Sequence, residues 1–361
     1  MRQITTLLVM ILFTAGMSFA QSNDASVDQQ GSDNSADVDQ QGYSNVAEVD
    51  QSGNDDVADI TQSGSSNEAF IDQAEGGSGA RFSDGSVDQQ GDGNYASQDQ
   101  TIRSAHNTIT AVIDQLGNEN TATQEQETRS SAHAGINQEG SYNEANQTQS
   151  FNYGYSSVNI DQVGDGNWAV QTQNAGSSEA TIIQNGDDNR AEQTQSGGNY
   201  AGNAADILQS GSDDHTQVQD GEGNYAEVRA FAGSNTGDQT QVGNDNHMQL
   251  NQSGGFDAVM SQDGDGNDAR LRQAGGSGSS AYLTQDGDDN SIGAEQQGSG
   301  NVMHVLQDGS GNYAGSDWWA NPGLVQDGND NMIDLSQTGD NHSASVHQYG
   351  DNNTANVTQS N

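Results

Sequence analysis

The chain has 361 residues, with 52 Asp or Glu against eight Lys or Arg, no cysteine and one proline, giving a formal net charge of −44 at pH 7. Nucleic acid is not expected as a partner because phosphate binding needs clustered cations, and a disulfide framework is excluded. Low hydrophobicity with high negative charge is also typical of disordered chains. The single proline and a fixed residue spacing argue against that interpretation.

Residues 1–20 differ from the rest. Arg2 is followed by an apolar run from Leu7 to Phe13 and by Ser18-Phe19-Ala20, a small-x-small cleavage sequence. This arrangement predicts a secretory signal peptide and a mature chain that begins at Gln21. No later segment is apolar enough to span a bilayer, so we expect a secreted, extracellular protein or one held outside the cell by other means.

From Asn23 onward, glutamine recurs about every 11 residues. The marker positions include Gln29, Gln40, Gln51, Gln62 and Gln73, and later Gln326, Gln337, Gln348 and Gln359. With Ala230 and Trp318 counted at marker positions, the chain contains about thirty units. Irregular steps near residues 74–88, 101–114 and 315–325 indicate loop insertions or deletions. The repeats fill residues 21–361 and leave no room for a second domain.

Each unit is predicted to be a strand followed by a turn. In residues 45–51, Asn45, Ala47, Val49 and Gln51 share one parity while more polar residues occupy the other, which is the alternation of a two-faced strand. Four residues with glycine in second place separate the units, as in 163–166. Glycine, Asn and Asp supply the left-handed backbone angles of tight turns.

The residue two before the marker predicts how the strands combine. Between Val87 and Gln239 it alternates between β-branched residues and glutamine, as in Ile136, Ile160 and Ile182 against Gln147, Gln171 and Gln193. The period is therefore two units, about 22 residues. This pattern predicts an all-β, amyloid-like β-solenoid in which strand-turn-strand rungs form two parallel, in-register sheets. One sheet carries a β-branched ladder and the other an amide ladder.

These repeats resemble the curlin repeat of bacterial curli fibre subunits. The pattern Gln-x-Gly-x-x-Asn-x-Ala-x-x-x-Gln runs from Gln162 to Gln173, and its companion Ser-x-Val-x-Ile-x-Gln begins at Ser156. The resemblance implies β-solenoid subunits that assemble into extracellular amyloid fibres of the biofilm matrix, acting in adhesion and cell aggregation. It also implies core ladders of the inward residues Ser156, Gln162, Asn167, Gln173, Ser178, Gln184, Asn189 and Gln195.

The chain departs from the curlin pattern in three respects. It has several times the usual handful of repeats. Its strands begin at Asn23, so the segment that directs family members to an outer-membrane secretion pore is not evident. Its charge is also far more acidic, with Asp28, Asp39, Asp50 and Asp72 at one recurring outward position.

The stacked carboxylates have two interpretations. They can act as solvated gatekeepers that oppose premature aggregation. Alternatively, divalent cations bind along the turns and relieve the repulsion. Asp263, Asp265 and Asn267 resemble the start of a calcium loop, although the expected glycine and the glutamate at the twelfth position are missing.

No catalytic constellation is found, so neither an enzyme nor a cofactor other than calcium is expected. The nearest histidine pair, His342 and His347, is interpreted as surface or ladder substitutions rather than a zinc site. Trp318 and Trp319 with Pro322 interrupt the repeat in a shortened unit. A kinked or looped rung is expected there, with a carbohydrate-binding aromatic patch as the alternative.

The leading functional hypothesis is a structural subunit whose end strands accept another copy, giving a head-to-tail homopolymer. The strands at the two ends carry Asn23 and Gln29 and, at the other end, Asn353 and Gln359. Two alternatives stay open: a nucleator of fibres made by a related curli subunit, and a monomeric adhesive or ligand-binding surface solenoid. A curli-type secretion system is a further expected partner.

Overall fold

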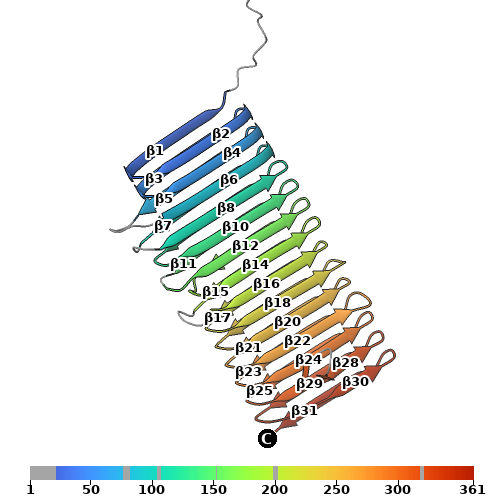
Figure 1. The fold of residues 1–361 in the computed structure, drawn as a ribbon. Helices are drawn as coiled ribbons and strands as arrows, with labels where there is room; N and C mark the ends of the chain where they lie inside the picture. Colours follow the sequence, from blue (N-terminus) through green and yellow to red (C-terminus); the bar gives the residue numbers. More distant parts are fainter. Residues whose placement is uncertain (1–21, 76–81, 104–106, 152, 198–201, 318–320) are drawn as a thin grey trace, which may run out of the picture.

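The computed structural model describes residues 22–75, 82–103, 107–151, 153–197, 202–317 and 321–361. The predicted signal peptide, residues 1–20, lies outside these residues. All regular structure in the described part is β-strand, and it includes no helix long and apolar enough to cross a membrane. The strands stack in chain order into one continuous ladder of rungs, from β1 at one end to β31 at the other (Figure 1).

The first sheet has 15 strands. They are β1 (Asp24–Ser32), β3 (Val46–Asn54), β5 (Glu68–Glu75), β7 (Tyr95–Ile102), β9 (Thr121–Thr128), β11 (Glu144–Phe151), β13 (Trp168–Gln173), β15 (Arg190–Ser196), β17 (Asp214–Asp220), β19 (Thr236–Val242), β21 (Asp257–Asp263), β23 (Ser280–Asp286), β25 (Val302–Asp308), β29 (Met332–Thr338) and β31 (Thr354–Ser360).

The second sheet lies across the core from the first. It is built from β2 (Ser35–Tyr43), β4 (Val57–Ser65), β6 (Phe82–Asp92), β8 (Thr108–Leu116), β10 (Ala132–Glu139), β12 (Ser156–Val163), β14 (Glu179–Asn185), β16 (Ala204–Ser210), β18 (Tyr225–Phe231), β20 (His247–Ser253), β22 (Asp268–Ala274), β24 (Ser291–Gln297), β26 (Tyr313–Asp317), β27 (Asn321–Pro322), β28 (Leu324–Asp327) and β30 (Val346–Tyr349).

The predicted parallel, in-register solenoid is confirmed. Ile136 on β10 is paired with Ile160 on β12, which is paired in turn with Ile182 on β14. In the other sheet, Gln147 on β11 is paired with Gln171 on β13. Consecutive chain units alternate between the sheets, so the two chemical types that alternate in the sequence separate into two ladders.

The core is a thin layer between the sheets. Inward residues alternate with outward ones in most strands; in β14, for example, Ala180, Ile182 and Gln184 are buried. Small alanines and aliphatic side chains fill the space, and most strands add buried carboxamides. Because the amides are hydrogen-bonded, the fold needs less apolar area than a conventional globule.

The first irregular step does not break the ladder. Gln62 and Gln89 stay in register although 27 residues separate them, and β6 is an 11-residue strand that begins at Phe82. The residues between Glu75 and Phe82 lie outside the described part. The longer spacing leaves the register of the flanking strands unchanged.

The expectation of a shortened unit with Trp318 at a marker position was wrong. Tyr313 and Ala314 on β26 begin a rung against β24, and Leu324 to Asp327 on β28 complete the same rung. Between them, the chain leaves the sheet through a short antiparallel pair of β26 with β27. The marker that stacks on Gln296 is Gln326, 30 residues away. The unit is looped, as expected, but lengthened; Trp318 and Trp319 lie outside the described residues.

Candidate functional site

The marker glutamines form a hydrogen-bonded column in each sheet. In the second sheet, Gln162 Nε2 donates to Gln184 Oε1 at 2.9 Å; in the first, Gln173 Nε2 donates to Gln195 Oε1 at 2.9 Å. The amide of each rung donates to the next rung along the chain, so the columns have one polarity. Each bond contributes about 1 kcal/mol, because the groups are buried and have no water to bind instead.

The second hydrogen of most marker amides crosses the core. Gln162 Nε2 donates to the carbonyl of Glu144 at 3.1 Å, and Gln184 Nε2 donates to that of Trp168 at 3.0 Å. Both carbonyls belong to strands of the opposite sheet. A marker glutamine therefore joins successive rungs and also joins the two sheets.

Asn and Ser form a further column at each edge of the core, where the strands begin. Asn189 N donates to Asn167 Oδ1 at 3.0 Å. At the other edge, Ser178 N donates to Ser156 Oγ at 3.3 Å, and Asn203 N donates to Ser178 Oγ at 3.1 Å. These side chains satisfy backbone amides that the turns would otherwise leave unpaired.

The inner amide ladder of the first sheet also crosses the core. Gln147 Nε2 donates to Gln171 Oε1, and Gln171 Nε2 to Gln193 Oε1, both at 2.9 Å. Gln171 Nε2 also donates to the carbonyl of Asn159 in the second sheet at 2.9 Å. After Gln239 this ladder becomes aliphatic, beginning with Met260. Hydrogen bonding between glutamines at this inner position is thus confined to the middle of the stack.

Three of the four outward acids singled out in the sequence stack in the first sheet, whereas Asp39 lies on β2 in the second sheet, opposite Thr61. Asp28, Asp50, Asp72 and Asp99 occupy consecutive rungs in register. Partial burial, then the neighbouring carboxylates of Asp99, Asp50 and Glu48, raise the pKa of Asp72. Burial, then Glu127, raises the pKa of Asp99. The charged forms at neutral pH therefore oppose the close stacking of these rungs.

Replacing Asp72 with Asn is expected to stabilise the fold by about 0.5 kcal/mol at pH 7 and low salt, because it removes repulsion across adjacent strands. The folded-state pKa is raised, so the penalty is absent below the ordinary value of 3.8 and grows as pH rises through the folded-state pKa. The gain should therefore disappear near pH 3, and it should shrink in about 1 M salt. Urea unfolding followed by circular dichroism measures it.

Asp161→Asn is the matched control. Asp161 is paired in register with Asn137 and Ile183, so no carboxylate stands directly opposite it. An equal gain in both variants would contradict repulsion between stacked acids as the cause.

The three calcium candidates have different environments. Asp265 Oδ1 accepts hydrogen bonds from the backbone and side-chain nitrogens of Asn244 at 2.8 and 3.1 Å. Asn267 is buried in an Asn column, where its Oδ1 accepts from Asn290 N at 3.0 Å, whereas Asp263 ends β21 on the exposed face. Within the residues described, no group of three or more His, Cys, Asp or Glu side chains is placed to hold a metal.

His342 and His347 have separate roles. His342 N donates to Asn312 Oδ1 at 3.0 Å, so this residue continues an Asn column. His347 is exposed on β30, where its Nε2 lies 3.3 Å from the Pro322 carbonyl.

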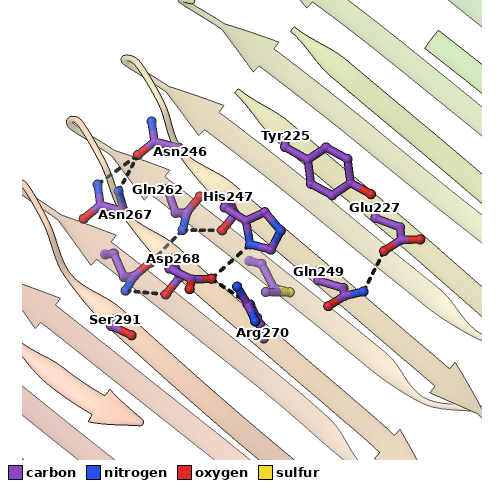
Figure 2. A network of polar contacts seen from close by, with 12 residues as sticks. Tyr225, Glu227, Asn246, His247, Gln249, Gln262, Asn267, Asp268, Arg270 and Ser291 are labelled. Carbon is purple, nitrogen blue, oxygen red and sulfur yellow. Dashed lines mark hydrogen bonds and ion pairs between the residues drawn. The ribbon is translucent and has the colours of Figure 1, made fainter. Parts of the chain in front are cut away.

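The outer face of the second sheet carries polar contacts between successive rungs. His247 Nδ1 and Arg270 Nε each lie 3.0 Å from Asp268 Oδ1, and Gln249 Nε2 donates to Glu227 Oε2 at 2.6 Å (Figure 2). The His247 ring stacks on that of Tyr225, with centroids 5.1 Å apart. These residues link β18, β20 and β22 on the solvent side, as the amide columns do inside.

One functional residue was missed by the sequence analysis. His215 is fully buried and lies between Gln209 and Gln252, on either side of the gap in the marker column that Ala230 creates. The signal available in the sequence was a set of three unusual inward residues close together. His215 and Gly237 stand where the neighbouring rungs have alanine, and Ala230 stands where they have the marker glutamine.

The end strands are open on one side. Within the described residues, β1 pairs only with β3 and β31 only with β29. Gln29 Nε2 donates to Gln51 and Gln337 Nε2 donates to Gln359. The first-sheet column therefore begins with an acceptor facing outward and ends with a donor facing outward. The Asn column runs oppositely, because Asn45 N donates to Asn23 Oδ1 and Asn353 N donates to Asn331 Oδ1.

Comparison with known proteins identifies the repeat. The curlin associated repeat matches residues 31–56, 53–82, 257–287 and 328–360. No curated protein matches the chain significantly. The matched segments lie toward both ends of the stack, and the strands between them continue the same columns in register. These matches support a curlin-repeat family for the chain, with multiple copies of the repeat.

Proposed function

We propose that this protein is a structural, non-enzymatic subunit that assembles head to tail into curli-like extracellular amyloid fibres of a bacterial biofilm matrix. Curlin repeats suggest a family of extracellular fibre subunits. The observation that carries the proposal is the single polarity of the marker columns, which end in unused acceptors at one end of the stack and unused donors at the other. A second copy of the chain presents the complementary groups.

Head-to-tail contact satisfies both kinds of column at once. The donor end offers Gln359 Nε2, which uses one hydrogen on the Ser343 carbonyl at 2.9 Å and keeps one for another acceptor. The same strand, β31, offers Asn353 Oδ1, while β2 at the other end offers Gln40 Oε1 and the backbone amide of Asn34. In the marker columns, contact between two acceptor ends would set oxygen against oxygen, and contact between two donor ends would set N–H against N–H. Either contact would also make the strands antiparallel, so assembly has one direction.

The strand order also sets the relation between successive copies. Both β1 and β31 belong to the first sheet, whereas β2 and β30 belong to the second. Consecutive strands alternate between sheets, so a gap-free junction places β1 of the next copy over β30 and β2 over β31. Gln29 then meets Gln348, and Gln40 meets Gln359. Successive copies are related by half a turn, and the fibre repeats every two copies.

Asn356→Pro is expected to slow fibre growth strongly while the subunit stays folded. Met332 N donates to the Asn353 carbonyl of the following rung, and Thr354 and Asn356 are paired with Met332 and Asp334. The N–H groups of Thr354 and Asn356 therefore face the open edge, where proline removes only a donor for the incoming strand. We expect elongation to slow at least tenfold, because one junction hydrogen bond is lost and the ring obstructs the incoming strand. Electron microscopy and amyloid-dye binding measure it.

Asn356→Ala is the matched control and should still elongate, with a two-copy repeat in image averages. Failure of this control to form fibres over days would support the monomeric adhesive solenoid instead. Seeding of a related curli subunit, without growth of this protein alone, would indicate a nucleator. Export by a curli-type secretion system belongs to the same proposal and is tested by deleting the secretion pore.

A further inference from the structure

The marker column of the second sheet has one gap. Gln184 Nε2 donates to Gln209 Oε1 at 2.9 Å, and Gln252 Nε2 donates to Gln273 Oε1 at 2.9 Å. Between Gln209 and Gln252 the register position is Ala230, which is fully buried and has no group to continue the column. Without another partner, one donor and one acceptor would stay buried and unsatisfied there.

The gap is filled from the opposite sheet. His215 on β17 stands in a column whose neighbouring members are small, in register with Ala191 before it and Gly237 after it. A Cβ at Gly237 would lie 2.7 Å from His215 Cδ2 and 2.7 Å from Leu250 Cδ2. The imidazole fits because Ala230 and Gly237 both lack the side-chain atoms that would occupy its space.

The imidazole accepts and donates hydrogen bonds in the same direction along the stack as the marker glutamine that is missing. Gln209 Nε2 lies 3.0 Å from His215 Nδ1, and His215 Nε2 lies 2.7 Å from Gln252 Oε1. Gln209 Oε1 already accepts from Gln184, so its nitrogen faces the ring and Nδ1 must accept. His215 is therefore a neutral imidazole protonated on Nε2, and it relays the donor direction from Gln209 to Gln252.

We infer that His215, Ala230 and Gly237 form an acid-sensitive joint in the solenoid, which closes while His215 is neutral and loosens strands β16, β18 and β20 when His215 takes up a proton. A proton on Nδ1 would face the Gln209 NH2 group, whose other hydrogen is donated to the Arg190 carbonyl at 2.8 Å. Rotating the Gln209 amide would break its bond from Gln184. No single side-chain movement accommodates the cation.

The surrounding charges do not remove this sensitivity. Burial is the largest influence and lowers the pKa of His215, whereas the hydrogen bond to Gln252 and the carboxylates of Asp213, Asp214 and Asp238 act in the opposite direction. The other charged side chains on the packed strands alternate outward: Arg190 and Glu192 on β15, Asp206 on β16, Asp220 on β17, Glu227 and Arg229 on β18, and His247 on β20.

The lowered pKa fixes the direction of the pH dependence. The stability of the joint is complete above the unfolded-state pKa of about 6.5. It is lost as pH falls below that value toward the folded-state pKa, because the open state binds the proton more readily. This direction is opposite to that of the stacked acids around Asp72, which are relieved by acid.

Amide hydrogen exchange on the full chain tests the inference. After correction for intrinsic rates, protection in β16, β18 and β20 should fall about tenfold per pH unit below pH 6.5. Protection in β11 and β13, whose inward residues are alanine and glutamine, should not fall in this way. Equal responses in both groups of strands would overturn the inference. The measurement uses unassembled protein, so its outcome is independent of fibre formation.

A restored column provides the matched variant. In the double variant His215→Ala/Ala230→Gln, the new glutamine joins Gln209 to Gln252 directly, and the new alanine matches the other alanines of its column. The acid response should therefore vanish, while protection from hydrogen exchange at pH 7.5 is kept. His215→Ala alone should lose protection at every pH, and the double variant remains decisive if that protein does not fold. The exposed control His304→Gln should retain the wild-type acid response. A double variant that keeps this response would refute the joint.

Discussion

Gln184→Glu is expected to lower the free energy of unfolding by roughly 3–5 kcal/mol at pH 7, because it buries a carboxylate that has a donor, Gln162 Nε2, at only one of its two oxygens. Gln184 Nε2 donates to Gln209 Oε1 and to the Trp168 carbonyl. Glutamate replaces this nitrogen with an oxygen that faces both acceptors. Urea unfolding followed by circular dichroism, with hydrogen exchange in β12, β14 and β16, measures the loss and shows where the stack opens.

The deficit should depend on pH in a defined direction. Burial raises the pKa of the new carboxyl above the ordinary glutamate value of about 4.3. Its neutral form can donate one hydrogen bond, so the deficit is small below that value and grows as pH rises through the folded-state pKa. The control Asn185→Asp makes the same amide-to-acid change at the adjacent exposed position and should cost less than about 0.5 kcal/mol. Similar losses in both variants would refute the role of the buried column.

The assignment of strands to sheets could be predicted because the sequence repeats inward chemistry with a two-unit period. Ile160 and Gln171 lie 11 residues apart but differ in type, while each matches the residue one full turn away. Side chains that stack in register favour their own kind, since aliphatic groups pack and amides bond to amides. Because residues that stack on one another are separated by a known number of residues in the sequence, the strand pairing can be predicted without knowledge of other long-range contacts.

The parts that could not be predicted depend on contacts outside that spacing. Ala230 was visible as a defect in the marker series, but its compensating side chain, His215, belongs to the other sheet and lies in a different column. Trp318 was assigned to a marker position by counting, whereas the ladder continues at Gln326 after the hairpin insertion. The spacing indicates which residues stack but not where a rung is interrupted. The direction of the amide columns also requires side-chain orientations.

Gly164→Ala is expected to destabilise the fold by roughly 3–5 kcal/mol, combining backbone strain with steric overlap. Gly164 has φ of 119°, which is largely reserved for glycine, and an added Cβ would lie 2.3 Å from the carbonyl oxygen of Gly186 on the next rung. That oxygen belongs to the backbone, so the clash cannot be relieved by a rotamer change. Urea unfolding and hydrogen exchange in β12 and β14 measure the result.

Gly278→Ala separates the two causes. Gly278 also has positive φ, 68°, but an added Cβ there would meet nothing within 4 Å. Only the left-handed backbone cost of about 1–2 kcal/mol applies. If the two variants lost equal stability, overlap between rungs would not explain the glycine column. If Gly164→Ala costs more, as expected, the turns limit how closely rungs can stack, because the glycines admit the neighbouring carbonyl at the distance that the amide columns require.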